Sequence, residues 1–491
     1  MRVLMLGWEF PPFISGGLGT ACYGLTKGLT GLGTDVTFVL PKAVGSDYHD
    51  HVRLLSPQSP RAAQGGRESA DVASSFTAAA SAQAVIDAQQ TGVAIDTAPI
   101  DTAPEEPQPP ALPGVQFRAV PSRITSPYPQ SPTRTGSGIG FVHSGTFAAD
   151  ANGPVNGQPP PPSDSPAPTV DPIVEAASPG QEYSGDLFGE TRRYADLCVE
   201  LAAGETFDVI HAHDWLTFPA GAAVAKATGK PLIVHVHSTE FDRAGDNGHH
   251  QLFAIERDGL LAADRVIAVS HLTRRVLESR YGCPSDKITV IYNGIENGKP
   301  YTKLKAPDPA PIAKTDKVVL YLGRITMQKG PEYFIHAAKR VLEKMDNVKF
   351  VMAGAGDKVR EVIELAARHG IGHKVLFTGF LRGDDVAKVF SMADVYVMPS
   401  VSEPFGIAPL EAISHDVPVI ISKTSGVSEV LQHVLKVDFW DIDEMANKIV
   451  AVLKYPPLGV TLRQHADLES RRLTWGDAAE ACQDVYTSVL N

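Results

Sequence analysis

The sequence predicts an α/β protein built from two doubly wound domains that face each other across a cleft. Short apolar runs alternate with amphipathic stretches along most of the chain, as parallel sheets covered on both faces require. The alternation stops in a polar, proline-containing segment at 298–316 and then starts again. A chain of 491 residues also has room for two or more domains of roughly 100–200 residues each.

Each half of the chain supplies the elements of one sheet. In the first half the predicted strands are 3–6, 36–40, 208–211, 232–235, 265–269 and 288–291. Helices are expected between them at 19–31, 219–228 and 271–281. In the second half the predicted strands are 318–322, 348–353, 375–377, 395–398 and 417–421. We therefore expect a first domain at 1–300, a second at 301–473 and a terminal helical segment at 474–491.

A long insertion interrupts the first half. Residues 56–180 hold 21 of the 38 prolines, with many Ala, Ser, Thr and Gly residues, and such a composition buries too little apolar surface to offset the entropy of ordering. We expect 56–113 and 130–180 to be mostly disordered, and the alternating segment 114–121 to form a strand. The insertion is interpreted as a tolerated surface loop, with a partner-docking segment as the alternative.

Composition and charge exclude several classes of protein. With 44 basic and 56 acidic residues the net charge is −12, which argues against nucleic-acid binding as the main task. No uncharged apolar stretch approaches the ~18–20 residues of a spanning helix, so integral membrane association is not expected. The four cysteines are scattered without a C-x-x-C pair, which is typical of a reducing cytoplasm. The N-terminal apolar run is interpreted as a first strand rather than a signal peptide.

Polar residues gather where the strands of the first half end. Gly16 and Gly17 follow the first strand, where glycines let backbone N–H groups approach an anion. The next carboxyl end reads His211-Ala212-His213-Asp214-Trp215, in which Asp214 could accept from sugar hydroxyls and Trp215 could stack on a sugar ring. His213 is taken with Asp214 as a candidate substrate-binding residue.

Two further histidines, His235 and His237, follow on the neighbouring strand. Alternation puts both on the same face, and His237 lies further toward the carboxyl end, so we expect His237 to reach the cleft. Without H-E-x-x-H or Cys–His spacing, a zinc site is not predicted.

The second half offers a basic pair and a pair of glutamates. Arg324 and Lys329 lie five residues apart in a loop after a strand, and could provide a forked donor and a point charge for a diphosphate. Gly354 follows another strand and permits close approach of a nucleotide. Glu403 and Glu411 flank a turn that starts a helix, with Glu403 facing the cleft and Glu411 two turns into the helix. Backbone amides of three residues in that turn could donate to a sugar or phosphate: Phe405, Gly406 and Ile407.

These motifs together resemble the retaining nucleotide-sugar glycosyltransferases of family 4 and the neighbouring glycogen and starch synthases, which share the GT-B fold. The matches run in order along nearly the whole chain except the insertion: Ser15-Gly16-Gly17-Leu18, His211–Trp215, His237, Asn293-Gly294-Ile295, Arg324 with Lys329-Gly330, and Glu403-x7-Glu411. Two departures matter. Ile14 and Ser15 stand where bacterial glycogen synthases usually carry the Lys-x of Lys-x-Gly-Gly-Leu, and Glu411, a position where those enzymes often lack a glutamate, points toward family 4.

The resemblance implies a role for each matching residue. Arg324 and Lys329 correspond to the basic pair that binds the donor diphosphate and stabilises the leaving nucleotide. Glu403 corresponds to the glutamate near the donor sugar, and Glu411 to the one that contacts the ribose. His237 corresponds to the histidine beside the reacting face of the sugar. Gly16 and Gly17 correspond to the glycines beside the diphosphate, and 474–490 to the helix that crosses back onto the first domain.

The expected activity is retaining transfer of a sugar, with glucose favoured, from a nucleoside diphosphate sugar to an α-glucan in the cytoplasm. A front-face substitution assisted by the leaving phosphate is preferred, and no metal or other cofactor is required because the basic pair takes its place. The alternatives are transfer to a lipid, sugar phosphate or small sugar, an epimerase or phosphorylase, and a non-catalytic glycan-binding protein. The nucleotide, the sugar, the acceptor and the oligomeric state stay open at this point.

Overall fold

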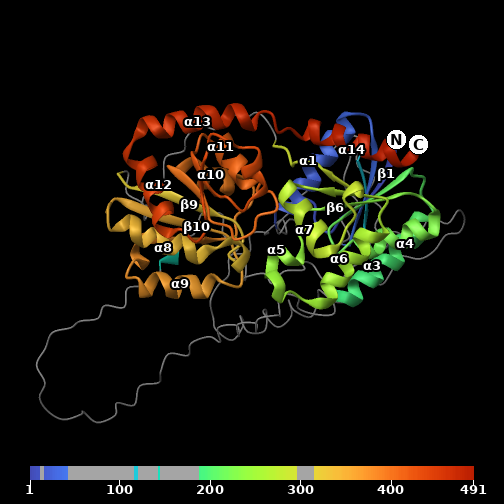
Figure 1. The fold of residues 1–491 in the computed structure, drawn as a ribbon, viewed down its shortest axis with the longest axis horizontal. Coiled ribbons are helices and arrows are strands. Elements are labelled where there is room, and N and C mark those ends of the chain that lie inside the picture. Colours follow the sequence, from blue (N-terminus) through green and yellow to red (C-terminus); the bar gives the residue numbers. More distant parts are fainter. Residues whose placement is uncertain (12–15, 42–114, 120–141, 144–186, 296–314) are drawn as a thin grey trace, which may run out of the picture.

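Two seven-stranded sheets organise the protein in the computed structural model, which describes residues 1–11, 16–41, 115–119, 142–143, 187–295 and 315–491. Each sheet forms the centre of one half of the molecule, with helices on both faces (Figure 1). The two halves are the first and second parts of the chain, so the predicted α/β fold with two doubly wound domains is confirmed.

The N-terminal sheet is entirely parallel in its described pairings and has the order β3-β2-β1-β5-β6-β7-β8. Its strands are β1 (Arg2–Leu6), β2 (Asp35–Leu40), β3 (Val115–Ala119), β5 (Val209–His213), β6 (Leu232–Val236), β7 (Arg265–Ala268) and β8 (Ile288–Val290). Successive side chains of β1 enter opposite core layers: Leu4 and Leu6 on one face, Val3 and Met5 on the other. Both faces of the sheet are therefore covered, which explains why its strands are continuous apolar runs.

Helices connect these strands and cover the sheet. They are α1 (Gly17–Gly31), α3 (Leu187–Ala202), α4 (Phe218–Thr228), α5 (Glu240–Ala244), α6 (His250–Ala262) and α7 (His271–Tyr281). The bounds of α7 are the predicted ones, because Ser270 caps its first turn and Gly282 ends it in a left-handed conformation.

The C-terminal sheet has the order β14-β13-β12-β9-β10-β11-β4. Its strands are β9 (Lys317–Leu322), β10 (Val348–Ala353), β11 (Val375–Gly379), β12 (Val395–Met398), β13 (Val419–Ser422), β14 (Leu435–Val437) and β4 (Val142–His143). The edge strand β4 comes from the insertion and pairs antiparallel with β11. A short segment can join a free sheet edge in this way through backbone hydrogen bonds alone. Apart from β3, the rest of 56–180 lies outside the described residues.

The helices of the C-terminal half are α8 (Pro331–Leu342), α9 (Val359–Arg368), α10 (Asp384–Met392), α11 (Ala408–Ser414), α12 (Ile442–Lys454) and α13 (Pro456–Ser470). The last helix, α14 (Trp475–Leu490), leaves this half and lies beside α1 on the N-terminal domain (Figure 1). Gly24 and Gly28 of α1 allow the close approach, because a Cβ at either position would meet Trp475. The chain thus crosses between the domains twice, as the resemblance implied for 474–490.

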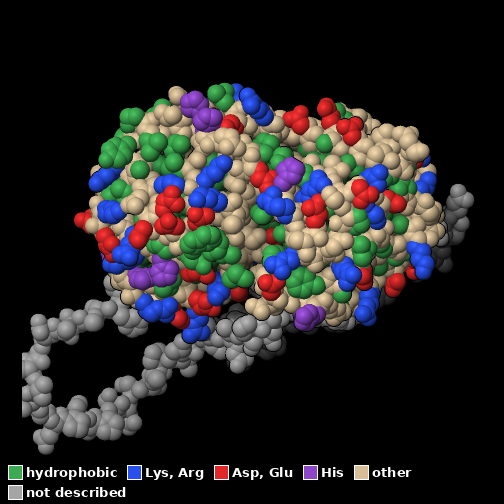
Figure 2. Space-filling model, in the orientation of Figure 1, with side chains coloured by type: hydrophobic (Ala, Val, Ile, Leu, Met, Phe, Trp, Pro, Cys, Tyr) green, Lys and Arg blue, Asp and Glu red, His purple; other side chains and the backbone are tan. Residues whose placement is uncertain are grey.

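Acidic and basic side chains are interspersed over both halves of the surface that faces the reader in Figure 2. This face carries no extended field of one sign, which agrees with the mild net charge of the sequence. In the part of the chain that the structure describes, no helix combines the length and the apolar character needed to cross a membrane.

Candidate active site

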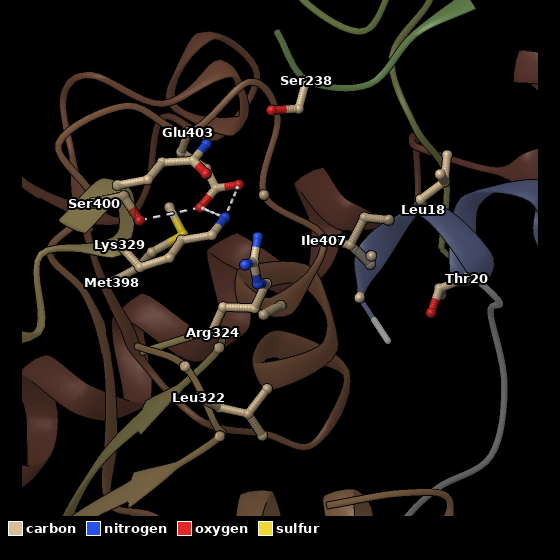
Figure 3. A pocket seen from close by; sticks show the side chains of 18 of the residues that line it. Leu18, Thr20, Ser238, Leu322, Arg324, Lys329, Met398, Ser400, Glu403 and Ile407 are labelled. Carbon is tan, nitrogen blue, oxygen red and sulfur yellow. Dashed lines mark hydrogen bonds and ion pairs between the residues drawn. The ribbon is translucent and has the colours of Figure 1, made fainter. Parts of the chain in front are cut away.

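A cleft of about 400 Å³ lies between the two domains, at the carboxyl ends of their strands. Both sheets contribute to its walls, and ligands of doubly wound folds bind at this end of the strands. Figure 3 shows Leu18 and Thr20 of α1 on one side, and Arg324, Lys329 and Glu403 of the C-terminal domain on the other. Twelve of the thirteen sequence-predicted site residues line this cleft: Gly16, Gly17, Asp214, His237, Arg324, Lys329, Gly354, Glu403, Phe405, Gly406, Ile407 and Glu411.

Glu403 and Lys329 form the charged centre of the C-terminal wall. The Lys329 ammonium lies 2.8 and 2.7 Å from the two carboxylate oxygens of Glu403, and Ser400 Oγ donates to Glu403 at 3.1 Å (Figure 3). Both side chains are mostly buried, so the ion pair sits in a medium that strengthens it. The loops that carry the pair are joined by their backbones, because the amide of Val401 donates to the carbonyl of Gln328.

Arg324 extends from the end of β9 toward Lys329 and Glu403 in Figure 3. Its backbone carbonyl accepts from the buried Tyr321 hydroxyl at 2.7 Å, which fixes the start of the loop. The loop closes at Gly330, whose φ of 60° is left-handed and where a Cβ would lie 2.2 Å from the Pro399 carbonyl oxygen. The guanidinium and ammonium therefore share one wall of the cleft, as binding of a diphosphate would require.

The turn after Glu403 differs from its predicted form. The helix begins at Ala408, so Glu411 lies in its first turn rather than two turns in. Gly406 has a φ of 103° and belongs to the turn before the helix. A Cβ at this position would lie 3.2 Å from Glu403 Cγ. Phe405 and Gly406 thus precede the helix, and Ile407 is its N-cap. Burial raises the pKa of Glu411 to about 7, so this carboxyl titrates near neutral pH.

Asp214 holds the backbone of the opposite wall. It adopts a left-handed conformation with a φ of 58°, and its Oδ1 accepts from the amides of His237 at 2.7 Å and Ser238 at 3.3 Å. Burial raises its pKa to about 7, against the stabilising hydrogen bond from the His237 amide. Asp214, which directly follows β5, therefore fixes the backbone conformation of His237 at the edge of the cleft.

Two expectations for this wall are wrong. His213 does not line the cleft: it is fully buried, and its Nδ1 lies 2.9 Å from Nε2 of His237. Trp215 is also buried in the core, 2% exposed, and cannot stack on a sugar. His213 is the last residue of β5, all of whose residues are buried, and Trp215 follows the left-handed turn at Asp214.

Three histidines are close enough to raise the question of a metal. Candidate ligand nitrogens of His211, His213 and His235 all lie within 4.8 Å of one another. Their rings are nearly parallel, however, with interplanar angles of 21° between His211 and His213 and 15° between His211 and His235. Imidazole lone pairs lie in the ring plane, so stacked rings do not aim them at one tetrahedral centre. The geometry favours a hydrogen-bonded stack over a metal site.

Glu9 and Arg243 are lining residues that sequence reasoning missed. Glu9 lies three residues beyond the end of the first strand, and this place near a carboxyl end was a usable signal. Arg243 had no such signal, because it comes from the short helix α5 and is placed by tertiary contacts. Its guanidinium donates to Glu240 at 3.1 Å and to Glu256 at 2.9 Å, and all three side chains are buried.

Family comparisons agree with this geometry. The family "Glycosyl transferases group 1" matches residues 303–468, "Glycosyltransferase Family 4" matches 159–298, and "Starch synthase catalytic domain" matches 2–87. Both halves of the chain therefore match glycosyltransferase domains, and the chain has the GT-B fold. The resemblance stated from its motifs is thereby confirmed, and the family matches support a nucleotide-sugar-dependent transferase.

Relatives of this glycosyltransferase have several different names. An uncharacterized glycosyltransferase of Methanocaldococcus jannaschii, MJ1607, is 37% identical over 238 residues, which cover 47% of this chain and 61% of the relative. The glycogen synthase of Mycobacterium tuberculosis is 28% identical over 290 residues, covering 57% of this chain and 68% of the relative. The chain thus spans about two thirds of the length of these relatives.

Solved structures show the same fold at low identity. A sucrose-phosphate synthase from Thermosynechococcus elongatus superposes with a TM-score of 0.62 at 17% identity, covering 99% of this chain and 98% of the other. Anabaena HepE, solved in complex with UDP and glucose, superposes with a TM-score of 0.57 at 16% identity, covering 99% and 100%. These likenesses support the two-domain architecture.

Proposed function

We propose that this glycosyltransferase moves glucose from a nucleoside diphosphate sugar to an α-glucan, with retention of the anomeric configuration. The observation that carries the proposal is the convergence of Arg324, Lys329 and Glu403 on one wall of an interdomain cleft. Two cations side by side suit a diphosphate, and the carboxylate paired with Lys329 suits the sugar attached to it.

The difficult step is the departure of the nucleotide while positive charge develops on the sugar. Arg324 and Lys329 stabilise the charge that grows on the diphosphate, and they need no reorganisation because their loop is already anchored. Lys329 forms an ion pair with Glu403, so donor binding places a second anion beside the same ammonium. In this account the basic pair takes the place of a metal ion, and the leaving phosphate assists a front-face attack by the acceptor hydroxyl.

Charges on the N-terminal wall favour an uncharged acceptor. Glu9 and Asp214 present carboxyl groups there, and the nearby Arg243 is bound to the buried carboxylates Glu240 and Glu256. A wall of this kind offers acceptors for sugar hydroxyls and little attraction for a second phosphate. This supports a glucan over a sugar phosphate, although one group of relatives is named D-inositol 3-phosphate glycosyltransferase.

The test is release of nucleoside diphosphate from ADP-, UDP- and GDP-sugars, each with and without glycogen. Glycogen-stimulated release from a glucose donor, with an α-linkage in the product by NMR, is the expected result. If a sugar phosphate or a lipid stimulates release of nucleoside diphosphate and glycogen does not, that compound replaces the α-glucan as the acceptor. Silence with every donor would overturn the proposal.

A further inference from the structure

A second groove lies on the C-terminal domain, between α8, the end of α9 and the start of α12. These helices lie on the side of the domain that is away from the N-terminal half (Figure 1). The groove has a volume of about 690 Å³, within the range of ~300–1,000 Å³ that is usual for ligand sites. None of the described residues that line it also lines the interdomain cleft, so the two are separate places on the molecule.

Trp440 gives this groove an open aromatic surface. Its side chain is 59% exposed, whereas the other three tryptophans of the chain are buried or half-buried. Phe439 meets the indole edge to face, with centroids 4.8 Å apart, and packs in turn against Tyr333 of α8 at 5.1 Å. An exposed aromatic ring that its neighbours already support loses little freedom on binding, and therefore suits a ligand that stacks on it.

Polar side chains from two helices complete the groove. His336 Nδ1 of α8 lies 3.0 Å from Nε2 of His369, the C-cap residue of α9. Lys339 and Glu343 follow about one and two turns further along α8. Burial and the neighbouring His369 lower the pKa of His336, so His336 adds no positive charge at neutral pH. The groove thus offers hydrogen-bond donors and acceptors beside a flat apolar ring.

The charges of the groove compensate one another. Arg340 lies 3.1 Å from Asp443 and 3.5 Å from Glu343. The Asp441 carboxylate accepts from the amide of Glu444 at 2.9 Å, so the N-terminus of α12 is already capped. Two basic and three acidic side chains line the groove, which gives it a formal charge of −1. An uncharged ligand therefore suits it better than a phosphate or another anion.

The groove is near the cleft but does not open into it. Helix α8 starts at Pro331, two residues after Lys329, and the lining residues 336–343 lie about 8–18 Å from that start along the helix axis. A polysaccharide is much larger than this distance, so one of its chains can occupy the groove while the end of another enters the cleft. A short oligosaccharide cannot reach both.

We propose that this groove is a second glycan site, which holds a chain of the acceptor polymer on the donor domain with Trp440 as its stacking platform. The indole stacks on the apolar face of a sugar ring, and His336, His369 and Lys339 form hydrogen bonds with the hydroxyls. Binding here raises the concentration of acceptor ends near the cleft without touching the reacting atoms. The choice of an α-glucan as the occupant rests on the proposed function, whereas the groove itself indicates an uncharged sugar chain.

The first experiment measures glycan binding without turnover. The full-length protein is run through native gels that contain increasing amounts of glycogen and no donor, beside Trp440→Ala and Trp440→Phe. We expect glycogen to retard the wild type and the Phe variant, which keeps an aromatic platform. Trp440→Ala should bind glycogen about tenfold more weakly because it has lost that platform.

Tyr455→Ala is the matched control, because Tyr455 is 62% exposed on the same domain and lies outside the groove. It should bind glycogen like the wild type, and both Ala variants should keep the thermal midpoint since neither side chain is buried. Equal retardation of the wild type and Trp440→Ala would overturn the proposal, as would equal weakening in Trp440→Ala and Tyr455→Ala. A Trp440-dependent change in fluorescence with inorganic phosphate, and none with maltoheptaose, would assign the groove to an anion and contradict the proposal.

Kinetics with a long and a short acceptor separate the groove from the cleft. In Trp440→Ala we expect the KM for glycogen to rise about tenfold, while kcat and the KM for maltotriose stay unchanged. An equal rise in KM for both acceptors would contradict a site outside the cleft. If no donor is turned over but Trp440-dependent binding of glycogen is found, the proposed function fails and the glycan site stands. If glycogen is elongated but binds independently of Trp440, the proposed function stands and the glycan site fails.

Discussion

At the residue scale, the site depends on interactions between residues that are far apart in the sequence. Arg324, Lys329 and Glu403 were predictable one by one, because each follows a strand and has the charge that a donor sugar nucleotide requires. The ion pair between Lys329 and Glu403 joins positions 74 apart, and only the folded sheet brings them together. His213 was misplaced for the same reason, since only the folded sheet packs it against His237 and Phe38.

Glu403→Gln tests the charge beside the donor sugar. The variant keeps the size of the side chain, leaves Lys329 without its anion and removes the carboxylate from the reacting face. We expect kcat to fall by about 100-fold, in the range seen when one preorganised electrostatic contact is removed, with donor KM changed much less. Initial rates with the donor found active in the panel provide the measurement.

Glu361→Gln is the matched control, because it breaks an exposed ion pair with Lys358 on the same domain at 2.6 Å. It should leave the rate unchanged, since exposed pairs contribute little. A Glu403→Gln enzyme with the wild-type rate would remove Glu403 from the catalytic centre.

Glu411 should make donor binding depend on pH near neutrality. Its pKa of about 7 means that it is largely protonated at lower pH, whereas accepting hydrogen bonds from ribose hydroxyls favours the carboxylate. Binding of an intact nucleotide sugar should therefore tighten as pH rises from about 6 to about 8, and binding should in turn release protons. Calorimetry in buffers of different ionisation enthalpy measures both effects.

Glu411→Gln should abolish this pH dependence while leaving some affinity. An unchanged pH profile in the Gln variant would assign the titration to another group, with Asp214 the next candidate because burial also raises its pKa to about 7.

At the element scale, the sequence predicts strands well and loop geometry poorly. The bounds of β12 and α7 match their expectations, because a continuous apolar run and a capped amphipathic run each have a local signature. The start of α11 was placed too early, because Gly406 extends the turn after Glu403. The edge strand β4 has no apolar alternation of its own and depends on the edge of β11.

Gly330→Ala tests the tight loop that carries Lys329. The residue is left-handed, and a Cβ would clash with the Pro399 carbonyl, so the two loops of the donor wall would be pushed apart. We expect a loss of unfolding free energy well above the ~1 kcal/mol of backbone strain alone, and weaker donor binding. Chemical denaturation and calorimetry measure the two effects.

Gly370→Ala supplies the matched control, since this residue has a φ of 67° and nothing within 4 Å of a Cβ. It should lose only the strain energy and keep donor affinity. Equal losses of stability in the two variants would mean that the contact with Pro399 is not limiting.

At the scale of the whole molecule, the two domains are tied together by groups that border the cleft. Glu429 of the C-terminal domain accepts from the amides of His271 at 2.9 Å and Leu272 at 2.7 Å, and so caps α7 of the other domain. Ser270 Oγ donates to the carbonyl of Pro404, next to Glu403, and Ser402 Oγ donates to Asp242 at 2.7 Å. The same interdomain hydrogen bonds therefore hold the domains together and position Glu403. Because they join distant parts of the chain, local sequence patterns cannot predict them.

Glu429→Ala should loosen this arrangement. Losing a carboxylate that accepts two amides across the interface should raise donor KM by about three- to tenfold and enlarge the radius of gyration of the donor complex in X-ray scattering. Glu469→Ala is the control, because Glu469 accepts from the amides of Gln432 and His433 within one domain. If both variants behave alike, the interdomain cap has no special role in closure.

The central claim is that the interdomain cleft binds a nucleoside diphosphate sugar through Arg324 and Lys329. Calorimetric titration of UDP-glucose, ADP-glucose and GDP-glucose into the wild-type protein and the Arg324→Ala/Lys329→Ala double variant tests it most directly. We predict saturable binding of at least one donor to the wild type, weakened by about 100-fold or more in the double variant because two charge-assisted contacts are lost. Binding of equal strength to both proteins, or of no donor to the wild type, would contradict the account.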